Sequence, residues 1–302
     1  MQNKYHVPVM LEECLNGLDI NPEGVYLDLT FGGGGHSRAI LEKLNGGRLL
    51  VFDQDPDAYQ ESLKIDSSSL IFIKSNFRSF GKYLRVHGVD QVDGILADLG
   101  VSSHQFDAVE RGFSFRGEAD LDMRMNPSQS LSARDVVNEY SPSDLHRLLG
   151  MYGEVKNAKT LASAICEARP VNTTTELLAV LNEVAKRGGA KYAAQVFQAI
   201  RIEVNDEMKA LEEMLMQTER YLTPDGRLVI MTYHSLEDRL VKNYIAKGKF
   251  FGEVEKDEFG NLIRPFDPVT RKPVVPDDAE IEMNNRARSA KLRVAKRTQL
   301  VR

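Results

Sequence analysis

Cysteine and long hydrophobic runs are scarce in this sequence of 302 residues. The two cysteines, Cys14 and Cys166, cannot build a disulfide framework and fit no metal-ligand spacing, which indicates a reducing compartment. No segment approaches the roughly 20 apolar residues of a membrane span, and residues 1–10 hold no apolar core of signal-peptide length. The six histidines are scattered, with no pair at ligand spacing beside a third ligand. These absences predict a cytoplasmic protein without a membrane segment or a metal site.

A net basic charge is also missing. Lys plus Arg is 39 against 44 for Asp plus Glu, which gives a net charge of −5 and, as a total, argues against a nucleic-acid partner. The charge is uneven, however, because Arg286 to Arg302 holds seven basic residues and no acid, which leaves −12 on residues 1–285. Leu292 and Val294 alternate with basic residues there, and this pattern predicts a sheet-edge strand with one basic face. If that face meets phosphates, binding should weaken steeply with salt.

Short apolar runs alternate with helical patterns along much of the chain. Such alternation predicts crossover connections and a doubly wound, mostly parallel sheet with helices on both faces, as in Rossmann-like α/β folds. A helix is expected at 37–44, and a second one at 206–222 precedes a turn at 224–226. Five strands are predicted, at 25–29, 48–53, 70–73, 94–98 and 227–232.

The strand rhythm breaks after Asp98. Residues 99–127 are expected to form an ordered loop region, and residues 131–205 show only helical signals. Ser141 before Pro142 is typical of a helix start, and Thr173 with Glu176 forms a capping-box pattern. The sequence therefore predicts three parts: 1–110 as the first part of the main domain, 111–204 as an inserted helical substrate-recognition domain, and 205–302 as the second part with a basic tail.

The segment from Asp28 to Ser37 places a glycine cluster between a strand and a helix. Glycines let backbone N–H groups approach a ligand, and Asp53 at the end of the next strand can accept hydrogen bonds from ribose hydroxyls. A dinucleotide and S-adenosylmethionine both fit this pattern. The third glycine of the dinucleotide fingerprint is missing, since Ser37 or Arg38 stands there. Asp28 also suits a ligand with a positive amino group, so the methyl donor is favoured.

Further blocks make a resemblance specific. The glycine segment resembles the first motif of the MraW/RsmH family, which methylates a cytosine N4 amine in bacterial small-subunit (16S) ribosomal RNA. The matching blocks follow in the expected order between residues 6 and 297: HVPVM at 6–10, DLGVSS at 98–103, RGFSF at 111–115, LDMRM at 121–125, FQAIRI at 197–202, HSLEDR at 234–239 and NRARS at 285–289. The resemblance implies an S-adenosylmethionine-dependent methyltransferase that releases S-adenosylhomocysteine.

The family's donor-binding positions carry over to Gly34, Gly35, His36, Asp53, Phe77, Asp98 and Gln105. Asp98 and His234 are the predicted catalytic residues, because both follow strands whose carboxyl ends should border the ligand site. Asp98 could accept a hydrogen bond from the cytosine amine, and His234 could orient the base or accept a proton. Alternatively, Asp98 only contacts the donor, and Ser235 with Asp238 caps the following helix.

Residues predicted to contact the RNA come from a loop and from the C-terminal region. Arginines beside aromatic residues can clamp phosphates and stack an unpaired base. Alternatively, the loop's phenylalanines anchor the insertion to its core. The set is Arg111, Phe113, Phe115, Arg124, Ser235, Arg286, Arg288 and Arg293.

Two other functions remain open from the residues alone. The glycine turn and Asp53 also suit a nicotinamide-dependent (NAD) oxidoreductase, although the missing glycine counts against it. A ribosome-assembly factor that binds RNA without catalysis is the second alternative. The expected partner is 16S ribosomal RNA within the small subunit, and the oligomeric state, a homodimer included, is left open.

Overall fold

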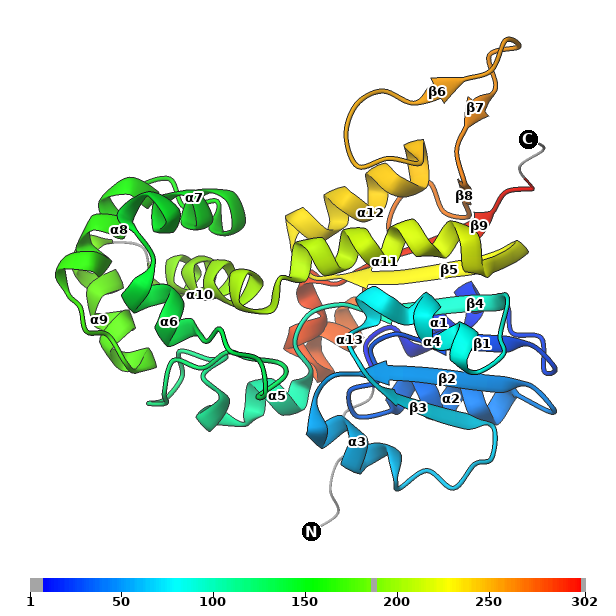
Figure 1. Cartoon of the computed structure of the whole chain (residues 1–302), viewed down its shortest axis with the longest axis horizontal. Helices are drawn as coiled ribbons and strands as arrows, with labels where there is room; N and C mark the ends of the chain where they lie inside the picture. The colour runs from blue at the N-terminus through cyan, green and yellow to red at the C-terminus, as the bar shows by residue number, and fades with distance from the viewer. Residues whose placement is uncertain (1–7, 186–188, 300–302) are drawn as a thin grey trace. The chain divides into compact units, whose positions relative to one another are not determined.

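A computed structural model describes residues 8–185 and 189–299 of the chain. The chain divides into two compact units, shown in Figure 1. Unit 1 consists of Met1–Gly100 and Met208–Arg302, and unit 2 is the intervening Val101–Glu207. The sequence prediction placed the inserted domain at 111–204. His6 and Val7 of the first family block and Arg302 of the basic run lie outside the described residues.

Unit 1 is built on a seven-stranded sheet with the strand order β3-β2-β1-β4-β5-β9-β8. Strands β1 to β5 run parallel, and β9 and β8 are antiparallel to their neighbours. The five predicted strands are these parallel strands, so the Rossmann-like fold is confirmed. The strands are β1 Val25–Asp28, β2 Arg48–Asp53, β3 Leu70–Lys74, β4 Val92–Asp98, β5 Leu222–Thr232, β8 Phe266–Pro268 and β9 Lys291–Arg297.

Helices cover both faces of the sheet, because alternate residues of each strand point to opposite sides. On β2, Leu50 and Phe52 belong to one buried cluster and Leu49 and Val51 to another. The first cluster includes side chains of α4, α11 and α12, and the second those of α1, α2 and α3. These helices are α1 Leu11–Leu18, α2 Gly35–Lys43, α3 Pro56–Ser62, α4 Phe80–Val86, α11 Glu207–Tyr221 and α12 Ser235–Lys247.

Two predictions about strands need correction. The turn expected at 224–226 lies inside β5, where the pairing jumps from Val92 with Leu222 to Gly94 with Arg227. The turn residues thus form a bulge, with Asp225 at φ 68°, and the strand continues on both sides. The basic strand β9 is not at the sheet edge, because β8 pairs with its end and Val274 forms a bridge with Leu292.

Unit 2 is helical around its own buried core, which includes Leu145, Leu161 and Val196. The predicted caps are confirmed: Ser141 accepts from the Asp144 N–H, and Thr173 and Glu176 form a capping box. The region expected to be loop contains a short helix, α5, and a 3-10 turn at Val109–Arg111. The helices of unit 2 are α5 Ser103–Asp107, α6 Ala133–Glu139, α7 Pro142–Gly153, α8 Ala158–Glu167, α9 Thr174–Val184 and α10 Gly189–Asn205.

The C-terminal part of unit 1 adds short elements around the sheet. Strands β6 Glu255–Lys256 and β7 Leu262–Ile263 pair as a small antiparallel ribbon, and helix α13 Asp278–Met283 leads into the 3-10 helix η3 Asn285–Ser289. None of the helices in the described ranges is long and apolar enough to cross a membrane.

Candidate active site at the strand ends

The loop between β1 and α2 leaves its backbone open to a ligand. Gly32 and Gly34 adopt positive φ angles of 52° and 76°, which glycine adopts without strain. A Cβ placed on Gly33 would meet no atom within 4 Å, whereas one on Gly34 would lie 2.7 Å from the Phe31 ring. Helix α2 begins at Gly35 without an acid in its first turn. The loop thus combines room beside its backbone with a helix N-terminus that favours negatively polarised ligand atoms.

Asp53 ties this loop to the end of β2. Its Oδ2 accepts the Gly32 N–H at 2.8 Å, and its Oδ1 accepts the Asp55 N–H at 2.9 Å. Burial raises the pKa of Asp53 to about 6, although these two hydrogen bonds oppose the rise. Each carboxylate oxygen has a second lone pair, so ribose hydroxyls can still be accepted. Phe77 starts a 3-10 turn shortly after β3, the strand next to β2, and is partly buried.

Asp28 has a structural task rather than the expected contact with an amino group. It is 1% exposed, and its carboxylate accepts the Ser37 hydroxyl at 2.5 Å and the Thr30 N–H at 3.1 Å. Thr30 in turn accepts the Asp98 N–H at 2.6 Å through its hydroxyl. These contacts fix the end of β1 against α2 and β4. The Asp28 carboxylate therefore has almost no exposed surface that a ligand could reach. His36 is buried, with Nε2 3.1 Å from the Val9 carbonyl oxygen.

Asp98 ends β4 and presents its carboxylate at the point where the strand order changes direction. Its Oδ1 accepts the Tyr233 hydroxyl at 2.8 Å, and Tyr233 follows the adjacent strand β5. Burial raises the pKa of Asp98 to about 6, against the lowering effects of His36 and of the Tyr233 hydrogen bond. Burial and the same carboxylate raise the pKa of Tyr233, so the phenol remains the donor. Asp98 is therefore a held hydrogen-bond acceptor beside the glycine loop.

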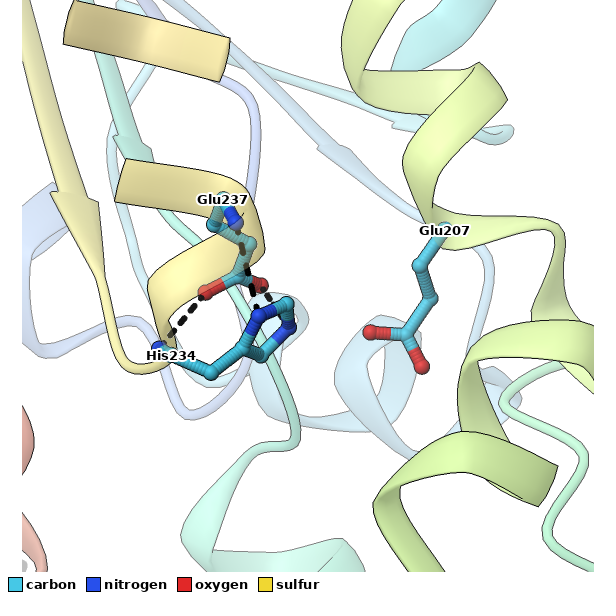
Figure 2. Close-up of side chains that lie close together, drawn as sticks. All are labelled: Glu207, His234 and Glu237. Atoms are coloured by element: carbon cyan, nitrogen blue, oxygen red, sulfur yellow. Dashed lines mark hydrogen bonds and ion pairs between the residues drawn. The ribbon is translucent and has the colours of Figure 1, made fainter. Parts of the chain in front are cut away.

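His234, rather than Ser235, is the N-cap of α12, which corrects the predicted capping alternative. Its ring Nδ1 accepts the Glu237 N–H at 3.4 Å, and the buried Glu237 carboxylate accepts the backbone N–H of His234 and of Tyr233 (Figure 2). Ser235 is exposed at the first position of the helix. Glu207, also labelled in Figure 2, belongs to unit 2, where it forms a bidentate ion pair with Arg201.

The predicted RNA-binding loop in unit 2 is held together by its own polar groups. Arg111 donates to the carbonyl oxygens of Arg124 and Met125, and Arg124 pairs with Asp122 at 2.6 Å. Phe113 is 5% exposed in the core of unit 2, and the Phe115 ring packs edge-on against Phe197. The phenylalanines therefore anchor the insertion to its core, the alternative left open by the sequence.

Gln105 is buried in α5 of unit 2. Its side chain accepts the Ser102 N–H at 3.1 Å and closes the capping box of that helix. This contact explains the residue's burial without a ligand, so donor binding by Gln105 stays a prediction.

Three cations of the basic run at the C-terminus form ion pairs within unit 1: Lys291, Arg293 and Lys296. Lys291 and Arg293 both pair with Asp238 of α12, and the Arg293 side chain is 12% exposed. Arg286 and Arg288 are exposed on η3, directly before β9. Because Lys291 pairs with Thr232 at the carboxyl end of β5, η3 lies at the same sheet edge as Asp98.

Tyr233 is the residue of this site that was not predicted from the sequence, whereas Glu237 was singled out as an acid beside His234 but without its role in the helix cap. A hydroxyl-bearing aromatic residue directly after β5 is the signal that could have identified Tyr233, because parallel neighbouring strands end at the same edge. Glu237 lies three residues after His234, the capping-box spacing, but histidine is not a usual N-cap residue.

Known proteins similar to this chain were found across its length. The profile of the MraW methylase family matches residues 3–298. A Cytophaga hutchinsonii protein named ribosomal RNA small subunit methyltransferase H is 56% identical over 297 residues, covering 97% of this chain and 99% of that protein. The protein of the same name from Bacteroides thetaiotaomicron is 53% identical, with 97% of each chain covered. Among solved structures, an rRNA methylase from Streptococcus thermophilus has a TM-score of 0.40 and 14% identity, covering 96% of this chain and 95% of that one.

Proposed function

Because this chain belongs to the MraW methylase family, we propose that it methylates the exocyclic N4 amine of a cytosine in the 16S ribosomal RNA of the small subunit. The family and the near-complete coverage of the two curated relatives support the rRNA substrate. They also favour methyl transfer over the nicotinamide-dependent alternative. The observation that carries the choice of an amine is the Asp98 carboxylate, which the Tyr233 hydroxyl fixes at the end of β4 and which can accept a hydrogen bond from an N–H.

The residues present fit S-adenosylmethionine as the methyl donor. Asp53 would accept hydrogen bonds from the ribose hydroxyls, and Phe77 would pack on the adenine. The backbone of the glycine loop would lie directly against the bound S-adenosylmethionine. The bound donor supplies a methyl group on a positively charged sulfur, which leaves as the thioether of S-adenosylhomocysteine.

Asp98 would act on the acceptor amine. The lone pair of the cytosine amine is delocalised into the ring, and a carboxylate that accepts its N–H favours the pyramidal nitrogen needed for attack. The same oxygen then takes the proton that the methylated nitrogen releases. The Tyr233 hydroxyl holds the carboxylate in position during both steps, and such fixed alignment supplies much of the rate enhancement in a displacement reaction.

The direct test is transfer of tritium from methyl-labelled S-adenosylmethionine to small-subunit particles or their RNA, followed by nucleoside analysis. We expect label in N4-methylcytidine, lost in Asp98→Ala and kept in Asp90→Asn, a control at an exposed position. Absence of label from every ribosomal substrate would overturn the proposal. Label in another nucleoside would leave an rRNA methyltransferase with a different acceptor atom.

A further inference from the structure

The imidazole of His234 is fixed in one tautomer by the cap of α12. Its Nδ1 accepts the Glu237 N–H, and an imidazole nitrogen can accept only where it carries no proton. The proton of the neutral ring therefore belongs on Nε2. This assignment follows from the hydrogen-bond pattern around the ring, since the proton itself is not observed. Figure 2 shows the ring directly below the first turn of α12, beside the Glu237 carboxylate.

The Nε2 atom is buried and lacks a partner in the described ranges 8–185 and 189–299. The His234 side chain is 8% exposed, and Nε2 lies 3.2 Å from Glu237 Oε1 without the direction that a hydrogen bond requires. The two observations agree, because Nε2 is near enough to Oε1 for an ion pair but does not meet the angles of a hydrogen bond. Buried donors are almost always satisfied in folded proteins, so this one calls for a ligand atom.

The orphaned donor and the acceptor Asp98 both follow strands that end at the same edge of the sheet. His234 directly follows Tyr233, whose hydroxyl is bonded to Asp98, and the strands that lead to both residues are adjacent and parallel. The Glu237 carboxylate also raises the pKa of Asp98, which indicates that the two groups face the same region of unit 1. The edge of the sheet thus offers one acceptor and one donor to a bound base.

We propose that His234 donates its Nε2–H to N3 of the target cytosine while Asp98 accepts from the N4 amine; the inference rests on the proposed function. Along its pairing edge, cytosine presents an N–H donor at N4 beside an acceptor at N3. Uracil presents the reverse, an acceptor at O4 beside a donor at N3. The pair therefore matches cytosine and opposes uracil at both positions, and enzymes that act on an extruded base read this edge.

The same tautomer removes His234 from proton transfer. With Nε2 already protonated and Nδ1 engaged in the helix cap, the neutral ring has no nitrogen free to accept the proton that the amine releases. Asp98 is left as the acceptor, and His234 becomes a specificity-determining residue. Of the two roles that the sequence left open for His234, orienting the base is thus favoured over accepting a proton.

The test combines an enzyme variant with a substrate analogue. In 3-deazacytidine, placed by RNA ligation at the mapped methylation position, a C–H replaces the N3 acceptor. His234→Asn keeps a side-chain oxygen that can cap α12, because asparagine is a preferred N-cap residue, but its short amide does not reach the position of the ring Nε2–H. Single-turnover methylation is measured for both enzymes on both RNAs. The intrinsic change in the amine affects both enzymes alike and cancels in the comparison.

We expect the analogue to slow the native enzyme about 10-fold or more relative to its effect on His234→Asn, because only the native enzyme has a donor placed to lose its partner at the N3 position. His234→Gln, whose longer side chain can bring its amide N–H to about the position of the ring Nε2–H, should recover part of this dependence. His87→Asn, at an exposed position after α4, serves as the control and should behave as the native enzyme. Donor affinity should be unchanged in all three variants.

Two results would overturn the inference. The first is that the fold-losses in methylation rate caused by the variant and by the analogue simply multiply. In that case His234 acts only as a helix cap, and the proposed cytosine N4 activity stands. If nucleoside analysis of the native reaction finds no N4-methylcytidine, the proposed function and the role of His234 fail together.

Discussion

Three aspartates end β1, β2 and β4, and their surroundings give them different tasks. Asp28 is enclosed by Ser37 and the loop backbone, so it fixes the fold. Asp53 holds the glycine loop through one lone pair on each oxygen, which leaves two for a ligand. Asp98 is held by a phenol that can only donate. The sequence placed all three at strand ends, but identical residue types could not reveal which one is sequestered.

The pKa of Asp98 predicts how the rate depends on pH. Because that pKa is raised to about 6, the carboxyl is protonated below this pH and cannot accept from the amine. The single-turnover rate constant should therefore fall about tenfold per pH unit there and be flat above it. Tyr233→Phe removes a hydrogen bond that lowers the pKa, so the fall should begin at a higher pH. The profiles are measured by single turnover at saturating donor, to exclude titration of donor binding. A Tyr233→Phe profile that coincides with the native one would contradict this role.

Asp53 predicts a separate pH dependence in donor binding. Its pKa is raised to about 6, and protonation below that value removes acceptors for the ribose hydroxyls, so the Kd for S-adenosylmethionine should rise as the pH falls through 6. Asp53→Asn should weaken binding by about 10-fold or more at pH 8 and flatten the pH dependence. Calorimetric titration measures both effects, with Asp90→Asn as the exposed control.

Asp53 also separates catalysis from a purely structural role in ribosome assembly. A protein with Asp53→Ala that no longer binds the donor should fail to restore methylation in cells that lack this gene. Full restoration of every cellular phenotype by that variant would favour an assembly factor instead.

At the scale of elements, α12 and β9 are joined by a shared carboxylate. Asp238 lies 2.7 Å from Arg293 Nε and 3.4 Å from Lys291 Nζ, with its side chain 14% exposed. Although burial alone would raise the pKa of Asp238, the Arg293 hydrogen bond and the two cations lower it overall. The ionised Asp238 carboxylate therefore stabilises the fold at pH values above the ordinary carboxyl pKa. This contribution is lost as the pH falls through the lowered pKa of Asp238 in the folded protein.

Asp238→Asn should reduce the free energy of unfolding by about 2 kcal/mol at pH 7, the usual loss for a partly buried charged hydrogen bond. The loss should shrink in acid, where the native carboxyl is protonated as well. Asp225→Asn is the matched control, because Asp225 pairs with Lys296 at the surface and its loss should not change the midpoint. Urea unfolding at pH 7 and pH 3 measures the effect; equal losses in both variants would contradict the argument.

The order and type of the main elements could be predicted from the sequence, since they depend on local patterns. Apolar runs marked β1 to β5, and the Ser141 and Thr173 signatures marked helix starts. Features that depend on distant partners could not be predicted. The turn at 224–226 is a bulge because β4 pairs on both sides of it, and β9 is internal because residues 266–268 and Val274 cover it.

The candidate site divides in the same way. The glycine loop, Asp53 and Asp98 follow strands directly, so motif and position identified them. Tyr233 and the capping role of Glu237 were missed, because a hydrogen bond to Asp98 or a cap by histidine leaves no pattern in sequence. The loop arginines were assigned to RNA since their internal carbonyl partners cannot be read from spacing.

At the scale of the whole molecule, the charge available for RNA is smaller than the basic run suggests. Asp238 and Asp225 neutralise three of its cations, whereas Arg288 is exposed on η3. We predict that Arg288→Ala weakens RNA binding and lowers the slope of log K against log salt by about 0.7. Arg293→Ala should leave the slope unchanged while lowering stability. Fluorescence titrations at several salt concentrations measure both, and equal slopes for Arg288→Ala and the native protein would exclude a phosphate contact.

The insertion of unit 2 between β4 and β5 also governs when during synthesis the enzyme becomes competent. Asp98 and Tyr233 are 135 positions apart, so the carboxylate leaves the translating ribosome long before the phenol that holds it. At about 5–20 residues per second, this interval lasts on the order of 10 seconds, during which β4 lacks its neighbour. Unit 2 is contiguous and can collapse in that time, but unit 1 must wait for its last strand. A nascent chain therefore has no assembled pair of Asp98 and Tyr233 until unit 2 and β5 have both been translated.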